Sequence, residues 1–151
     1  MIEVLLAVVV LAIGLLAGSK MQMLGLNYTQ GAQMRSTATL AANDIIDRMR
    51  LNPAGVAAGA YDNTSTDSLP INPNCISTGC SPADLADHDL IVWASYFGKG
   101  PGANTSTPLK DALGEIDLDA ATGFYDIKVT WTELIEGEEK VREISMGVNL
   151  N

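Results

Sequence analysis

An uncharged apolar stretch, residues 4–18, places the strongest constraint on what this chain folds into. Apart from two glycines it contains only Val, Leu, Ala and Ile, and it lies between Glu3 and the next charged residue, Lys20. A helix rises about 1.5 Å per residue, so roughly 20 apolar residues cross the hydrocarbon core of a bilayer. Residues 1–26 supply that length when Glu3 and Lys20 lie near the two interfaces. The stretch therefore predicts a transmembrane helix.

A secretory signal peptide and a buried core helix are the alternatives for this segment. A signal peptide carries basic residues before an apolar core of about 7–15 residues, and a small-residue cleavage site after it. Neither flank is present here, and the helical pattern continues into a polar region. We prefer the transmembrane helix to both alternatives.

The helical pattern continues beyond the apolar stretch. Small and apolar residues recur at helical spacing among polar ones, which is typical of an amphipathic helix with one buried stripe. The stripe comprises Tyr28, Ala32, Ala38, Ala42, Ile45 and Met49, with Ile46 beside it. Pro53 disfavours helical backbone at the residue before it, so we predict one helix over residues 2–51.

The N-terminal sequence Met1-Ile2-Glu3, followed by the apolar helix, resembles the start of type IV pilin-like proteins. In that family a peptidase removes a leader, and the mature chain begins with a box close to Phe-Thr-Leu-Ile-Glu. Residues 1–3 match the last three positions of the box, with Met1 in place of Leu. The resemblance implies that the leader and the first two mature residues are absent from this sequence.

The resemblance gives Glu3 a role in assembly. An ionised carboxylate in hydrocarbon is costly without a partner, and in the family that partner is the methylated N-terminal amine, commonly of a neighbouring subunit. The alternative is an interfacial acid favoured by the dipole at a helix N-terminus. The apolar residues that would cross the membrane and pack in the filament are Val4, Leu5, Leu6, Val8, Val9, Leu11, Ile13 and Leu15.

The end of the predicted helix also resembles a family motif. In minor pilins of the PilV type, the type IV pilus modification proteins, this helix closes with a box close to Asp-x-x-Asp-Arg-Met-Arg-x-Asn, followed by a small loop. The matching residues are Asp44, Asp47, Arg48, Met49, Arg50, Asn52 and Gly55. Taken alone, the pattern indicates a charged helix end, with Asp44 and Arg48 as a pair worth about 0.2–0.5 kcal/mol.

Residues 53–82 have the composition of a loop, rich in Gly, Asn, Ser, Thr and Pro. They contain the only two cysteines, Cys75 and Cys80. A zinc site needs more ligands than one histidine adds, and a redox dithiol normally has two residues between its cysteines, not four. Export of this part of the chain would permit a disulfide, which we predict between Cys75 and Cys80.

The remaining segments predict one short helix and three strands. Ser81 and Pro82 are typical of a helix start, and apolar residues continue at helical spacing to Trp93, which we assign to the core; the run 80–93 again resembles PilV. Residues 115–119, 125–131 and 144–150 alternate as in an antiparallel meander with one buried face. The fold class is therefore α+β, a type IV pilin-like fold with a long N-terminal helix, its apolar half protruding, packed on a small antiparallel sheet.

Two acids and the single histidine are the candidate metal or catalytic residues of the chain. Asp117 and Asp119 lie at alternate positions of a strand, which is more typical of a solvated face than of a calcium site. His88 has Asp87 and Asp89 beside it but no third partner, so we predict a surface histidine. We expect no metal, no cofactor and no catalytic site.

Charge and order divide the chain into two predicted parts. Residues 1–26 form the transmembrane or filament-core half of the helix. Residues 27–151 form a periplasmic head, with the helix end at 27–52, a loop and short helix at 53–98, and the meander at 113–151. Residues 53–151 contain fifteen acids and five bases, which makes nucleic acid a poor partner for the head.

The resemblance implies a minor pilin that assembles through contacts with other major and minor pilins and the pilus machinery. It would be a single-pass protein of the inner membrane before assembly and part of the pilus on the cell surface afterwards. The alternatives are a minor pseudopilin of type II secretion, which shares the N-terminal box, and a membrane-anchored periplasmic enzyme or ligand-binding domain.

Overall fold

The computed structural model describes residues 2–103, 106–135 and 137–150. Met1, Glu136 and Asn151, which some of the predictions above include, lie outside these ranges. The chain divides into two compact units, Met1–Gln33 and Met34–Asn151, and helix α1 (Ile2–Leu51) contributes residues to both. The predicted helix over residues 2–51 is confirmed.

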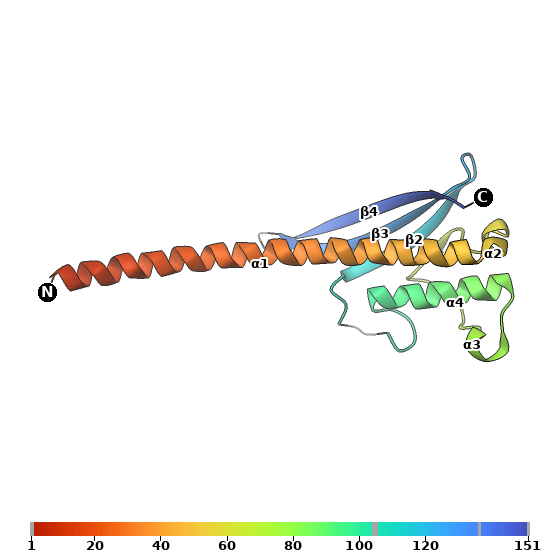
Figure 1. Ribbon diagram of the computed structural model, residues 1–151, viewed down its shortest axis with the longest axis horizontal. Helices are drawn as coiled ribbons and strands as arrows, with labels where there is room; N and C mark the ends of the chain where they lie inside the picture. Colours follow the sequence, from red (N-terminus) through yellow and green to blue (C-terminus); the bar gives the residue numbers. More distant parts are fainter. Residues whose placement is uncertain (1, 104–105, 136, 151) are drawn as a thin grey trace. The chain divides into compact units, whose positions relative to one another are not determined.

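The second unit contains a four-stranded antiparallel sheet in the order β1-β2-β3-β4, of which Figure 1 labels β2, β3 and β4. The long strands are β2 (Lys110–Asp119), β3 (Phe124–Ile135) and β4 (Glu138–Asn149), and they match the three predicted strands except that Leu150 lies just beyond β4. β1 (Thr64–Ser65) adds two residues to the outer side of β2. The other elements of this unit are helical: α2 (Pro53–Ala57), α3 (Cys75–Thr78), α4 (Pro82–Ala94) and the 3₁₀ turn η1 (Ser95–Phe97).

The core forms where the predicted stripe of α1 packs on the inner face of the sheet. Ala38, Ala42, Ile45 and Met49 are all fully buried, but Tyr28 and Ala32, which were predicted to belong to the same stripe, are exposed. They belong to the same hydrophobic cluster as Tyr125, Ile127, Val129 and Trp131, the alternating residues of β3. The apolar side chains at helical spacing on α1 and those at alternate positions of β3 therefore pack in one core, as predicted.

Helix α4 lies beside the second half of α1 and closes the other side of the core (Figure 1). Trp93 is fully buried, and its indole Nε1 donates a hydrogen bond to the carbonyl oxygen of Ala41 at 2.8 Å. The Trp93 ring meets Phe97 edge to face, with centroids 5.2 Å apart. A Cβ at Gly114 of β2 would lie 2.8 Å from Trp93 Cζ2 and 2.9 Å from Phe97 Cε2, so only glycine fits under these two rings.

Residues 53–82 are not the continuous loop that their composition suggested, because they contain α2, β1 and α3. The Asn52 side chain accepts a hydrogen bond from Gly55 N at 3.1 Å, and Pro53 stands at the first position of α2. Asn followed by Pro is a favourable helix start, a signal hidden by the loop-like composition around it. β1 is continued by Thr66, whose backbone and hydroxyl both bond to Gly114.

Candidate functional site

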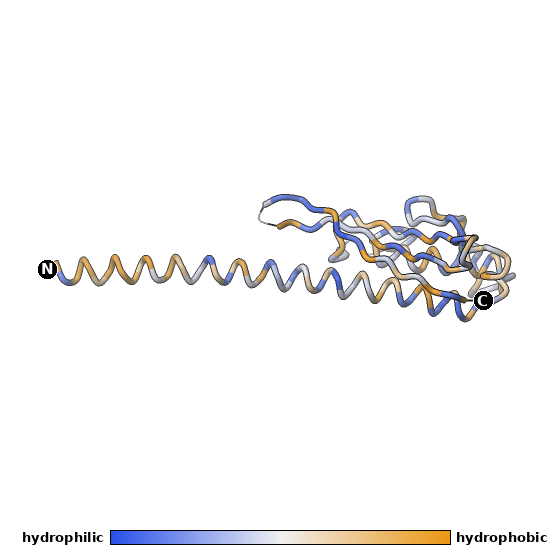
Figure 2. The backbone as a smooth tube through the Cα atoms, turned by 90° about the horizontal axis from the view of Figure 1, so that it is seen from above, coloured by the Kyte–Doolittle hydropathy of each residue, from blue (hydrophilic) through white to orange (hydrophobic). Residues whose placement is uncertain are grey.

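The first unit is an exposed apolar helix. All eight residues predicted to cross the membrane lie in it with side chains more than half exposed, and the hydropathy colouring of Figure 2 is hydrophobic over most of these turns. The helix is long and apolar enough to span a membrane by length and composition. Glu3 lies in its first turn, exposed, and makes no hydrogen bond or ion pair with any residue that the structure describes.

The residues of the second family box divide between two sides of α1. Arg48 Nε donates to Asp44 Oδ2 at 2.7 Å, and Arg48 Nη1 lies 3.4 Å from Asp89 Oδ1 on α4. Met49 is fully buried in the core. Asp47 and Arg50 pair with each other at 2.8 Å on the exposed side of the helix. The box therefore supplies both core contacts and a solvated ion pair.

Asn52 connects the end of α1 to two other segments. Its Nδ2 donates to Tyr61 Oη at 3.1 Å and to the carbonyl oxygen of Pro82, at the start of α4, at 2.8 Å. Tyr61 Oη in turn donates to Asp89 Oδ2 at 2.7 Å. Asn52, Tyr61 and Asp89 are all buried, so these bonds replace the water that their polar groups lose on folding.

We call Asp44, Arg48, Asn52, Tyr61 and Asp89 the helix-end network. Burial alone would lower the pKa of Arg48, but its hydrogen bonds to and charge attraction by Asp44 and Asp89 raise that pKa overall. Burial, followed by the hydrogen bond to Asp89, raises the pKa of the Tyr61 phenol well above its usual value. The network therefore holds a charged guanidinium and a neutral phenol.

Sequence reasoning missed Tyr61 and Asp89, which complete this network. The sequence contained a signal for Asp89, because it recurs at helical spacing with Ala86, Leu90 and Trp93, which are all buried on α4. An acid inside an apolar helical stripe needs a buried partner. Tyr61 had no comparable signal, since it lies in a turn-rich segment.

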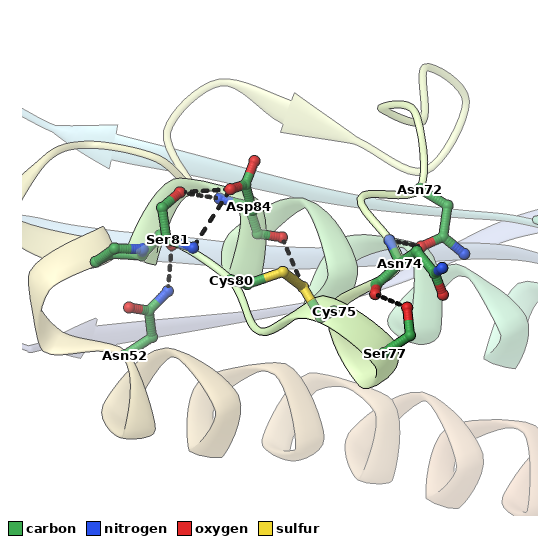
Figure 3. The surroundings of a disulfide bond; sticks show 9 residues. Asn52, Asn72, Asn74, Cys75, Ser77, Cys80, Ser81 and Asp84 are labelled. Atoms are coloured by element: carbon green, nitrogen blue, oxygen red, sulfur yellow. Dashed lines mark hydrogen bonds between the residues drawn. A yellow bond between two sulfur atoms is a disulfide. The ribbon is translucent and has the colours of Figure 1, made fainter.

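The structure joins Cys75 and Cys80 in a disulfide, with their Cα atoms 5.1 Å apart. Figure 3 shows this bridge between α3 and the residues that start α4. Ser81 caps α4 by accepting a hydrogen bond from Asp84 N, and the Asp84 carboxylate accepts from Ser81 N in return. The disulfide and the capping box thus fix the same end of α4 that Asn52 contacts.

The candidate ligands Asp117, Asp119 and His88 form no metal or catalytic site with the other described residues. Asp119 accepts hydrogen bonds from Thr122 Oγ1 and Ala121 N in the β2–β3 turn, and these bonds lower the pKa of Asp119. Asp117 is exposed on β2. His88 is half-buried rather than a surface residue, and its Nδ1 has no hydrogen-bond partner among the described residues. The described residues contain no group of three or more His, Cys, Asp or Glu side chains arranged to hold a metal ion.

Comparison with known proteins gives one family match. Residues 20–91 match the family model described as Tt1218-like, type IV pilin Tt1218. That range includes the whole second family box, both cysteines and most of α4. No curated protein and no solved structure matches the chain. The family match, with a long N-terminal helix packed on an antiparallel sheet, supports a type IV pilin-like protein.

Proposed function

We propose that this chain is a minor pilin of the PilV type, which takes part in assembling and modifying a type IV pilus through contacts with other pilins. The observation that carries the proposal is the match of residues 20–91 to a type IV pilin family model. The resemblance of residues 44–55 to the closing box of PilV, inside that range, supports the minor-pilin assignment over a pseudopilin.

The apolar segment has two successive roles in this proposal. It holds the protein in the inner membrane, with the head in the periplasm, and then packs against the helices of other pilins. Its exposed side chains support both roles, because none of the most apolar segment of α1 is buried inside the protein. Helices in such packing associate through van der Waals contacts and a few polar interactions.

In this proposal Glu3 makes the polar interaction that favours assembly with a neighbouring pilin. Its carboxylate lies in the first turn of an apolar helix and lacks a partner among the described residues. In an apolar surrounding such a group needs a cation, and the free N-terminal amine of a neighbouring pilin would supply one. The second unit has a structural rather than enzymatic role, supported by its buried polar groups: Asn52, Tyr61 and Asp89 are all bonded within the chain.

Replacement of the Glu3 charge tests the proposal. Glu3→Gln in the protein expressed from its own gene should leave membrane recovery unchanged, because removing a charge makes the helix more lipophilic. Recovery of the chain with other pilins, in sheared fibres or detergent-solubilised complexes, should fall several-fold, because the amine of the neighbour loses its counter-charge.

Asp47→Asn is the matched control, because it neutralises an exposed acid on the same helix. It should leave recovery with pilins unchanged. Equal recovery of the Glu3→Gln variant and the wild type would mean that Glu3 is only an interfacial acid. Absence of the wild-type chain from every pilin fraction would refute the pilus function itself.

A further inference from the structure

Strand β4 covers the core incompletely. It is the last strand of the sheet, and its inward residues Ile144, Met146 and Val148 are half-buried. Their partners across the β3–β4 ladder are Val129, Ile127 and Tyr125, which are at most 1% exposed. The apolar surface of the core therefore continues to the edge of the sheet and stops there uncovered.

The second half of this edge lacks the features that normally block strand pairing. Residues 138–143 include five charged residues, but residues 144–149 contain neither a charge nor a proline. Charged residues and prolines protect natural edge strands from further pairing. Among the described residues, no backbone hydrogen bond outside the β3 ladder is made by residues 141–148.

A cleft of about 390 Å³ lies between this strand and α1. It is lined by Arg35 and Thr39 of α1, Trp131 of β3 and residues 141–144 of β4. The indole Nε1 of Trp131 is buried and has no hydrogen-bond acceptor among the described residues. If another strand paired with β4, its inward side chains would therefore enter this cleft.

The charges around the cleft favour an acidic occupant. Arg35 is exposed and pairs with no acid in the described part of the chain. Arg142 is already neutralised by Glu133, whose Oε2 accepts from Arg142 Nε at 3.1 Å. Glu143 alternates with Arg142 along β4, so its side chain belongs to the outer face of the sheet. Among the described residues that line the cleft, Arg35 is therefore the unpaired cation on the inner side.

We propose that an extended, acid-bearing segment of a neighbouring pilin subunit adds as a strand to the free edge of β4 and places a carboxylate beside Arg35. Backbone hydrogen bonds to the edge would hold the segment, and its alternate side chains would cover Ile144 and Met146 and enter the cleft. The identity of the partner as a pilin rests on the proposed function; the edge, the cleft and the unpaired arginine do not.

The test combines photocrosslinking with charge reversal in the full chain produced in its own cells. Benzoylphenylalanine replaces Ser145, which is exposed on the uncharged half of β4. Irradiation should attach the chain to another pilin subunit, identified by mass spectrometry of the adduct. Arg35→Glu should reduce the yield of this adduct several-fold, and Arg35→Gln should reduce it less, because it removes the cation without adding repulsion.

Arg50→Glu is the matched control, since it reverses an exposed arginine on the same helix and away from the cleft; it should leave the yield unchanged. Recovery of the chain with pilins is measured in parallel. If the chain is recovered with pilins but gives no adduct from position 145, or an adduct insensitive to both Arg35 variants, the strand addition is refuted while the pilus function stands. If the chain is absent from pilin fractions, both are refuted.

Discussion

Asp89 illustrates how one residue determines the position of a helix. Its carboxylate is buried on the inner side of α4, where an unpaired charge would be strongly unfavourable. Tyr61 and Arg48 satisfy its two oxygens from the turn after α2 and from α1. Because each bond requires a particular distance, α4 is held in one rotation against the end of α1.

Tyr61 makes this arrangement sensitive to alkaline pH. A group whose pKa is raised by folding contributes stability that is present below its unfolded-state pKa and lost as the pH rises through the folded-state value. For the Tyr61 phenol that loss begins above its ordinary value of 10.0. The urea unfolding free energy of the wild type should therefore fall as the pH is raised from about 10 to about 11, and Tyr61→Phe should remove part of that fall.

The same substitution removes the donor to Asp89, so Tyr61→Phe should also be less stable than the wild type at about pH 8, by about 1–3 kcal/mol. Tyr28→Phe, at an exposed position on α1, serves as the control. It should change neither the unfolding free energy nor its dependence on pH. If the unfolding free energy of Tyr61→Phe changed with pH in parallel with that of the wild type, the phenol would ionise in the folded protein without loss of stability, which would contradict the prediction.

At the scale of elements, predictability followed the length of each periodic pattern. α1 and the three long strands were predictable because many residues repeat one spacing. Such a pattern stays recognisable even where a single residue departs from it. α2, β1 and α3 are two to five residues long, too short to repeat a spacing, and α2 alone has a local start signal, in Asn52 and Pro53. The Tyr61–Asp89 bond joins residues 28 positions apart, which places it beyond any local pattern.

The family box shows the same limit. Its residues were identified from sequence, and the pairing of Asp44 with Arg48 followed from helical spacing alone. Which box residues enter the core, and which remain in solvent, depends on where α4 and the sheet pack. The sequence contains the partners of the network, but only the tertiary fold brings them within bonding distance.

The buried stripe of α1 supplies a prediction about this element. Ile45→Ala should lower the unfolding free energy by about 2–5 kcal/mol, because Ile45 is fully buried in the core that α1 forms with the sheet. Leu40→Ala on the same helix should cost less than about 1 kcal/mol, since Leu40 is 62% exposed. Urea unfolding of both variants measures the difference, and similar losses would mean that the buried face of α1 was assigned incorrectly.

At the scale of the whole molecule, the buried core and the proposed assembly segment belong to different parts of the chain. Every buried apolar residue of the core lies between Ala38 and Trp131, inside the second unit. The first unit consists of a single helix with exposed apolar side chains. These exposed apolar side chains fit the membrane and filament environments proposed for the first unit.

This division predicts that a protein starting at Met34 folds without the first unit. Its part of α1 should remain helical, since the fully buried Ala38, Ile45 and Met49 hold it against the sheet. The truncated protein should stay soluble without detergent, because the exposed apolar residues of the first unit are removed. Its urea unfolding free energy should match that of the full chain in detergent within about 1 kcal/mol, and Ile45→Ala should lower both by the same amount. Loss of cooperative unfolding on truncation, with the disulfide intact, would instead show that residues before Met34 contribute to the stability of the head.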